Sequence, residues 1–160
     1  MLRGSVYYYL ESKEARLFEL MEEVCAGFLA FLEEIRASDD DALVKLRRLV
    51  RRHISYLVEN RVSTTLFLTE FRSLSEEHQS VVAGHEEGYR RAVQDLIGEG
   101  QQEGLVREDV DADVAAMALL GAANWVYRWH GRHGRASSEE IARQFERILG
   151  DGLSSLRGAH

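Results

Sequence analysis

The sequence contains no proline, and this absence shapes every expectation about its fold. Proline breaks a helix more strongly than any other residue, so only the thirteen glycines and short polar turns are left to end helices. Long stretches of good helix formers lie between those glycines, and 45% of the residues are hydrophobic, which is enough to build a core. The sequence therefore predicts an all-α fold that forms one helical bundle.

Cysteine and long apolar runs are also scarce. Cys25 is the only cysteine, so no disulfide can form within the chain, and its apolar helical setting predicts a small buried side chain rather than a reactive thiol. No apolar run reaches the length needed to cross a bilayer, and the first residues lack the pattern of a signal peptide. We therefore expect no membrane partner and a cytoplasmic location.

Basic residues are in deficit, because the formal net charge at pH 7 is -7. Such a charge argues against a protein whose whole surface is basic and suited to nucleic acid. The deficit is uneven along the chain. Residues 1–16 carry three basic and two acidic side chains, so the acidity belongs to the remainder. A locally basic segment at the N-terminal end is compatible with this distribution.

The residue patterns of common catalytic and metal sites are missing as well. Two histidine pairs, His78 with His85 and His130 with His133, are close in sequence, but neither has a third metal ligand nearby. No histidine follows a glutamate by three residues, and no HExxH, GxSxG or glycine-rich phosphate-loop motif occurs. The sequence predicts no enzyme activity, no metal site and no cofactor.

Apolar residues recur at helical spacing in six segments. The expected helices cover residues 12–37, 40–59, 62–74, 76–103, 111–131 and 137 onward. Polar residues at their starts have the character of N-caps, and a glycine is an expected stop. These are Ser38 in a capping box with Asp41, Ser75, Asp111, Ser137 in a capping box with Glu140, and the stop at Gly104.

The segment GSVYYYLESKEAR near the start carries a more specific pattern. It resembles the end of the helix-turn-helix of TetR-family transcriptional regulators, where the recognition helix closes and the next helix begins. Leu10 stands where the family more often has phenylalanine. The positions that carry the resemblance are Gly4, Val6, Tyr7, Tyr9, Ser12, Lys13 and Glu14.

The resemblance implies two domains and a role for the first in reading double-stranded DNA. Residues 1–16 would be the remnant of a helix-turn-helix domain, and residues 17–160 a helical ligand-binding and dimerisation domain. Complete members have two helices ahead of the recognition helix, so the resemblance implies a start assigned at an internal methionine or a truncated chain. The implied DNA contacts are Gly4, Ser5, Tyr7, Tyr8, Tyr9 and Lys13. The alternative is that the tyrosines pack on the body as an amphipathic lid.

A second stretch, GLVREDVDADVAAMALLGAANWVYRW, is similar to the sequence that leads into the penultimate helix of the same family. Its end, NWVYRW, resembles a subgroup associated with fatty-acid and sterol catabolism, whose effectors are often acyl-CoA thioesters. The resemblance therefore implies a homodimeric repressor of a lipid or related catabolic pathway. A small hydrophobic effector such as an acyl-CoA thioester would relieve its binding to DNA.

Large side chains in the middle of the chain are candidate contacts for that effector. Arg72 follows a very apolar short helix and could orient an acidic group, or its stem could pack while its head reaches water. Aromatic residues at helical spacing could line a cavity, although such residues are usually core. The candidate effector residues are Phe67, Phe71, Arg72, His85, Tyr89, Asn124 and Trp125.

The last two expected helices are candidates for a four-helix dimer interface, because small residues and large apolar ones alternate there. The candidate interface residues are Gly121, Ala122, Trp129, Ile141, Phe145, Ile148, Leu149 and Leu153. The alternative function is a helical small-molecule-binding or protein-interaction module that does not bind DNA.

Overall fold

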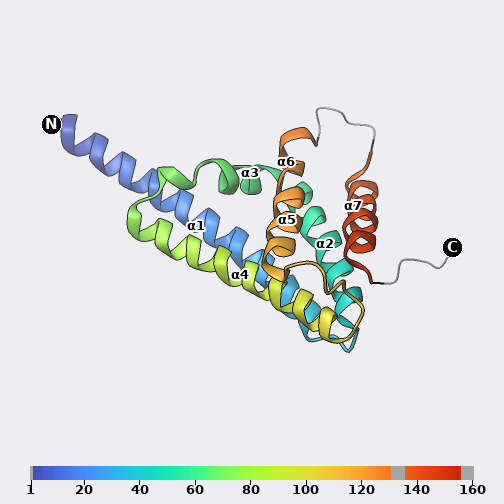
Figure 1. Cartoon of the computed structure of the whole chain (residues 1–160). Helices are drawn as coiled ribbons and strands as arrows, with labels where there is room; N and C mark the ends of the chain where they lie inside the picture. The colour runs from blue at the N-terminus through green and yellow to red at the C-terminus, as the bar shows by residue number, and fades with distance from the viewer. Residues whose placement is uncertain (1, 131–135, 156–160) are drawn as a thin grey trace.

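A computed structural model describes residues 2–130 and 136–155, and it confirms the all-α prediction (Figure 1). Seven α-helices and one short 3-10 helix follow one another in this described part of the chain. Their bounds are α1 Leu2–Arg36, α2 Ala42–Glu59, α3 Arg61–Thr69, the 3-10 helix η1 Phe71–Ser73, α4 Glu76–Gln102, α5 Ala112–Asn124, α6 Val126–Trp129 and α7 Ser138–Leu153.

Helix α1 is longer than the sequence pattern predicts. It begins at Leu2 rather than Ser12 and continues without a turn for 35 residues, or about 52 Å. The hydroxyl of Ser12 donates to the carbonyl oxygen of Tyr9 at 2.9 Å, which is a bond made inside a helix rather than at its start. The domain boundary predicted at residue 16 therefore falls in the middle of one helix. In Figure 1 the N-terminal end of α1 projects beyond the other helices.

The second half of α1 forms the centre of the core. Its buried side chains recur every three or four residues and contact α2, α3 and α4. Burying one large apolar side chain stabilises a fold by about 1.5–3 kcal/mol, so this face holds α1 firmly to the body. The buried residues of α1 are Met21, Val24, Cys25, Phe28, Phe31, Leu32 and Ile35.

Most of the predicted helix ends are confirmed. Ser75, Asp111 and Ser137 each accept a backbone N–H of the first turn of α4, α5 and α7. Gly104 has a φ of +72°, the left-handed conformation that follows many helices and favours glycine. The capping box predicted at Ser38 is wrong, because Asp41 is the N-cap of α2 and accepts from the N–H of Val44 at 2.8 Å.

Two expected helices are divided in the structure. The segment predicted as 62–74 ends its α-helix at Thr69, and η1 then carries the chain to α4. The segment predicted as 111–131 is interrupted at Trp125, where the N–H of Arg128 bonds to the Trp125 carbonyl oxygen, three residues back instead of four. The part of that prediction beyond residue 130 lies outside the described residues.

Helix α7 packs on α2, and charged pairs at its edges join the two helices. Arg47 and Arg51 of α2 pair with Asp151 and Glu139 of α7 at 2.6 and 2.9 Å. Helix α5 packs on α4. Helices α5, α6 and α7 lie on the side of the bundle away from the projecting end of α1 (Figure 1). Within the described residues, no helix combines the length and apolarity that a membrane crossing requires.

Two glycines near the end of α4 provide a test of this packing. A Cβ at Gly98 would meet nothing within 4 Å, whereas a Cβ at Gly100 would lie 2.5 Å from a methyl group of Val106. We expect Gly98→Ala to raise the free energy of unfolding by up to about 1 kcal/mol, because alanine favours helix. We expect Gly100→Ala to lower it, because the Val106 segment must move. Urea denaturation of both variants checks this, and a change of the same sign in both would contradict the packing.

Candidate functional site

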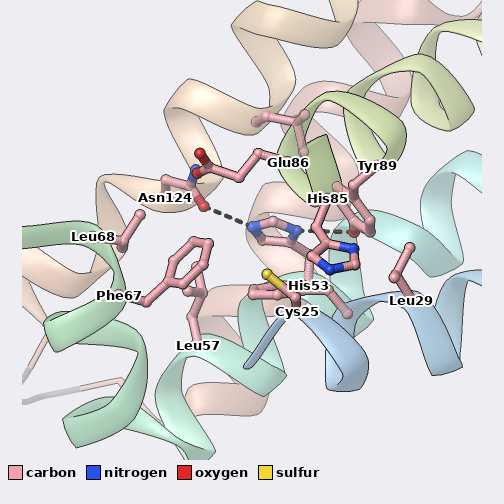
Figure 2. A pocket seen from close by; sticks show the side chains of 12 residues that line it. Cys25, Leu29, His53, Leu57, Phe67, Leu68, His85, Glu86, Tyr89 and Asn124 are labelled. Atoms are coloured by element: carbon pink, nitrogen blue, oxygen red, sulfur yellow. Dashed lines mark hydrogen bonds between the residues drawn. The ribbon is translucent and has the colours of Figure 1, made fainter. Parts of the chain in front are cut away.

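A cavity of about 90 Å³ lies where α1 to α5 meet (Figure 2). One wall is apolar and the other carries polar side chains, so the cavity has the mixed lining typical of small-molecule sites. Helix α1 contributes to it three side chains of its buried half. The lining residues are Cys25, Phe28, Leu29, His53, Leu57, Phe67, Leu68, His85, Glu86, Tyr89, Leu120 and Asn124.

The polar wall is organised by His53, a buried residue of α2. Its Nδ1 lies 3.0 Å from the Tyr89 hydroxyl, and its Nε2 lies 2.9 Å from Oδ1 of Asn124 (Figure 2). An amide oxygen can only accept, so Nε2 carries the hydrogen and donates to Asn124. Nδ1 then accepts from the hydroxyl of Tyr89. One histidine thereby joins α2, α4 and α5 through hydrogen bonds.

Burial keeps this histidine neutral. Desolvation lowers the pKa of His53 from its usual 6.5 to about 4, although the hydrogen bond to Asn124 favours the charged form. Desolvation also raises the pKa of the Tyr89 hydroxyl, so that side chain stays protonated and able to donate. The network is therefore uncharged at neutral pH and has a defined direction of donation.

Aromatic contacts connect this network to α1. The ring of Phe28 lies 4.7 Å from that of His53, 4.8 Å from that of Tyr56 and 5.5 Å from that of Tyr89, measured between centroids. These separations are typical of favourable aromatic pairs. Phe28 thus contacts both the polar wall and the adjoining α2 surface from α1, and Phe31 lies 6.0 Å from Tyr56 and 6.3 Å from Tyr89.

The mouth of the cavity is acidic. Glu86 lines it with part of its side chain exposed, and desolvation of the carboxyl group raises the pKa of Glu86. His85 also lines the mouth, and its Nε2 lies 4.0 Å from a carboxylate oxygen of Glu22. Burial raises the pKa of the Cys25 thiol to about 12, so this cysteine is an inert part of the wall. Among the residues that the structure describes, neither lysine nor arginine lines the cavity.

The candidate effector residues divide into two groups. Phe67, His85, Tyr89 and Asn124 line the cavity together, although they come from three different helices. The other three lie outside its lining: Phe71 packs on the core from η1, Arg72 is exposed, and Trp125 is 57% exposed with its ring beside Arg128. The α-helix that carries Phe67 and Leu68 to the cavity ends at Thr69, and Arg72 belongs to the separate η1.

Sequence reasoning missed the central residue of the site. His53 falls on the apolar stripe of α2, between Val50 and Leu57, where a histidine has the spacing of an ordinary core residue. The signal that could have drawn attention to it is the demand of a buried imidazole for two hydrogen-bond partners. Cys25 was expected as a small buried side chain, and it also lines the cavity.

The segment that resembles a DNA-reading helix is exposed. Tyr7, Tyr8 and Tyr9 are 69%, 76% and 66% exposed, so they do not pack on the body as the alternative interpretation required. Lys13 is exposed beside them. Gly4 and Ser5 belong to α1, while their side-chain environment lies outside the described part of the structure.

Below the tyrosines, Glu14 joins α1 to the start of α4. Its carboxylate accepts from the backbone N–H of Ser75 at 2.9 Å and contacts Nδ1 of His78 at 2.7 Å. The ring of His78 stacks on Phe18 with 3.7 Å between centroids. The Ser75 bond and then the His78 bond lower the pKa of Glu14. The exposed tip of α1 therefore emerges from a region fixed to α4.

The candidate dimer residues lie on α5, α6 and α7, with different exposure. Ile141 is buried, Ala122, Trp129, Phe145, Leu149 and Leu153 are half-buried, and Gly121 and Ile148 are exposed. Trp129 and Phe145 stack across α6 and α7 with 6.3 Å between centroids. Part of the predicted interface, such as Ile141, thus packs within the chain, whereas Gly121 and Ile148 are exposed to solvent.

The fold and the cavity together define a helical bundle of the ligand-binding type. Residues 39–153 match the family described as "Tetracyclin repressor-like, C-terminal domain". The chain therefore belongs to the TetR family of transcriptional regulators.

Known relatives agree with this assignment. The chain is 26% identical to the HTH-type transcriptional repressor KstR2 of Rhodococcus jostii, over 97% of this chain and 76% of that protein. A TetR/AcrR-family regulator from Thermobifida fusca has a similar structure, with 33% identity, a TM-score of 0.78, and coverage of 93% of this chain and 79% of that one. AibR in complex with isovaleryl coenzyme A and operator DNA has 25% identity, a TM-score of 0.73, and coverage of 91% and 79%.

The buried histidine gives the protein a predictable response to acid. Because the pKa of His53 is about 4 in the folded state and 6.5 when unfolded, the unfolded chain binds more protons between these values. The free energy of unfolding is therefore not reduced by His53 above about pH 6.5. Below that pH it falls, and at pH 4 the loss due to His53 is about 3 kcal/mol. Urea denaturation between pH 7 and 4.5 should show a smaller loss of the free energy of unfolding in His53→Gln than in the unaltered protein. Parallel curves for the two proteins would contradict a buried neutral histidine.

Proposed function

We propose that this protein is a ligand-responsive transcriptional repressor whose effector enters the cavity and displaces α1. The observation that carries the proposal is connectivity. The helix that lines the cavity with Cys25, Phe28 and Leu29 also carries Tyr7, Tyr8 and Tyr9, with no break between them. A group wedged against Phe28 must move α1 or the helices facing it, and the exposed tip moves with α1.

The movement matters because of how dimeric regulators read DNA. Two recognition helices must fit half-sites about one helical turn apart, and a change in their separation weakens both contacts together. An effector that binds the displaced state better shifts the population toward it. Tyrosine hydroxyls and Lys13 would contact phosphates and fix the register of the helix in the groove.

The size of the cavity points to the kind of effector. At about 90 Å³ it is well below the roughly 300–1,000 Å³ of pockets that hold a whole drug-sized ligand. It is also smaller than the cavity of roughly 150 Å³ that holds benzene, so it suits a small end group of a ligand and not a whole one. AibR was crystallised with isovaleryl coenzyme A, and KstR2 is a repressor. We therefore propose an acyl-CoA thioester with a short or flexible acyl end, in a lipid or related catabolic pathway.

Homodimer formation is part of the proposal. Val114, Met117, Gly121 and Trp125 recur every three or four residues along α5 and at its end, and all are exposed. Ile148 of α7 is 68% exposed. A stripe of this kind on two C-terminal helices suits a four-helix interface between two copies.

The effector mechanism predicts a loss of DNA binding on ligand addition. Duplexes selected by the protein from a random library should contain two related half-sites, and isovaleryl-CoA should release them. Cys25→Leu adds hydrocarbon to the cavity and should raise the ligand concentration needed for release about tenfold or more, since overpacked sites resist a guest. Val81→Leu, at an exposed position of α4, is the control and should respond normally.

Gel-shift titration measures both steps. The proposal fails if no duplex is enriched, and the cavity is the wrong site if Cys25→Leu responds to ligand as the unaltered protein does.

Dimerisation is tested at Ile148. A glutamate there would place a charge in the proposed interface, and we expect Ile148→Glu to shift sedimentation velocity from a dimer toward a monomer. Val62→Glu introduces the same charge at a residue of α3 that is 75% exposed and outside the stripe, so it should remain dimeric. Equal behaviour of the two variants would contradict this interface.

A further inference from the structure

We propose that the cavity selects an uncharged, oxygen-bearing end of the effector, and that Asn124 and Glu86 set this selectivity. The inference rests on the proposed function, because it names the chemistry of the part of the effector that enters the cavity. A free carboxylate would be rejected, whereas a ketone, an amide or the carbonyl of a thioester would be accepted.

Asn124 presents its oxygen to His53, with Oδ1 2.9 Å from Nε2 of the imidazole. The amide nitrogen points away from His53 and forms no hydrogen bond with any residue that the structure describes. A side chain that lines a cavity with a free, oriented N–H donor is suited to an acceptor oxygen of a ligand. Tyr89 completes the arrangement by holding the opposite nitrogen of His53.

The charge around the cavity opposes an anion. Glu86 lines the cavity, and a carboxylate oxygen of Glu22, which lies outside the lining, is 4.0 Å from Nε2 of His85. Figure 2 draws the carboxyl group of Glu86 and the amide of Asn124 on one side of the cavity. A ligand carboxylate would lose its hydration there without meeting a lysine or arginine, since neither occurs among the described residues that line the cavity. The donor of Asn124 alone cannot offset that loss.

Three small probes of equal size separate these effects. Propionamide, 2-butanone and propionate have the same number of non-hydrogen atoms, but only propionate is charged near pH 8. We expect chemical-shift titration of the intact 160-residue chain by NMR to show propionate binding about tenfold or more weaker than propionamide.

Two variants assign the selectivity to residues. Glu86→Lys supplies the missing cation and should make propionate the tighter ligand of that pair. Glu99→Lys makes the same charge change at an exposed position of α4 outside the cavity, and should keep the original order. Asn124→Asp keeps an oxygen for His53 but removes the amide donor, so 2-butanone should bind about fivefold more weakly.

The inference is overturned if propionate binds the unaltered protein as well as propionamide, if none of the probes binds, or if Glu86→Lys leaves their order unchanged. These outcomes are separate from the fate of the proposed function. Selective binding of the probes without any release of DNA would leave the selectivity intact and remove the regulatory role. Release of DNA by an acyl-CoA thioester with no selectivity among the probes would do the reverse.

Discussion

The continuity of α1 is the constraint on which the rest of the structure depends. One helix of 35 residues packs its second half into the core and leaves its first turns exposed. Helix hydrogen bonds connect the two halves, so a displacement at Phe28 cannot be absorbed by a loop before it reaches Tyr9. The contact of Glu14 with Ser75 and His78 adds a second attachment, which places the pivot of any tilt near the start of α4.

The polar wall of the cavity illustrates why a binding site differs from a core. Filling the space with aliphatic side chains would stabilise the bundle more simply, yet three helices place a histidine, a tyrosine and an asparagine there. The two hydrogen bonds satisfy both nitrogens of the imidazole, while burial keeps His53 neutral. Such a wall costs stability in acid and provides an oriented donor in the cavity.

Local chemistry made much of the fold predictable. Ser75, Asp111 and Ser137 could be recognised as N-caps because a short acceptor side chain before an apolar periodic segment has few other uses. The continuity of α1 was harder to predict, because Ser12 can either cap a helix or bond back to the turn before it. Its hydroxyl bonds back to the preceding turn, and no proline or glycine lies between Gly4 and Ser12 to force a break in the helix.

The site was only partly predictable, because it depends on which helices meet. Tyr89 and Asn124 were expected as effector contacts, but their shared partner His53 has the spacing of a core residue, and only the packing of α2 against α4 and α5 shows its role. Trp125 has the same helical spacing as the residues around it, but it lies at the interruption between α5 and α6, where its side chain is 57% exposed.

The separation of the two exposed tips in a dimer tests the central claim most directly. Spin labels attached at Tyr9→Cys, with Cys25 replaced by serine, would report the distance between the two copies of α1 by pulsed electron paramagnetic resonance spectroscopy. If α1 transmits motion as one body, saturating effector should shift that distance by several ångströms. An unchanged distance distribution in protein shown to be fully bound would contradict the account.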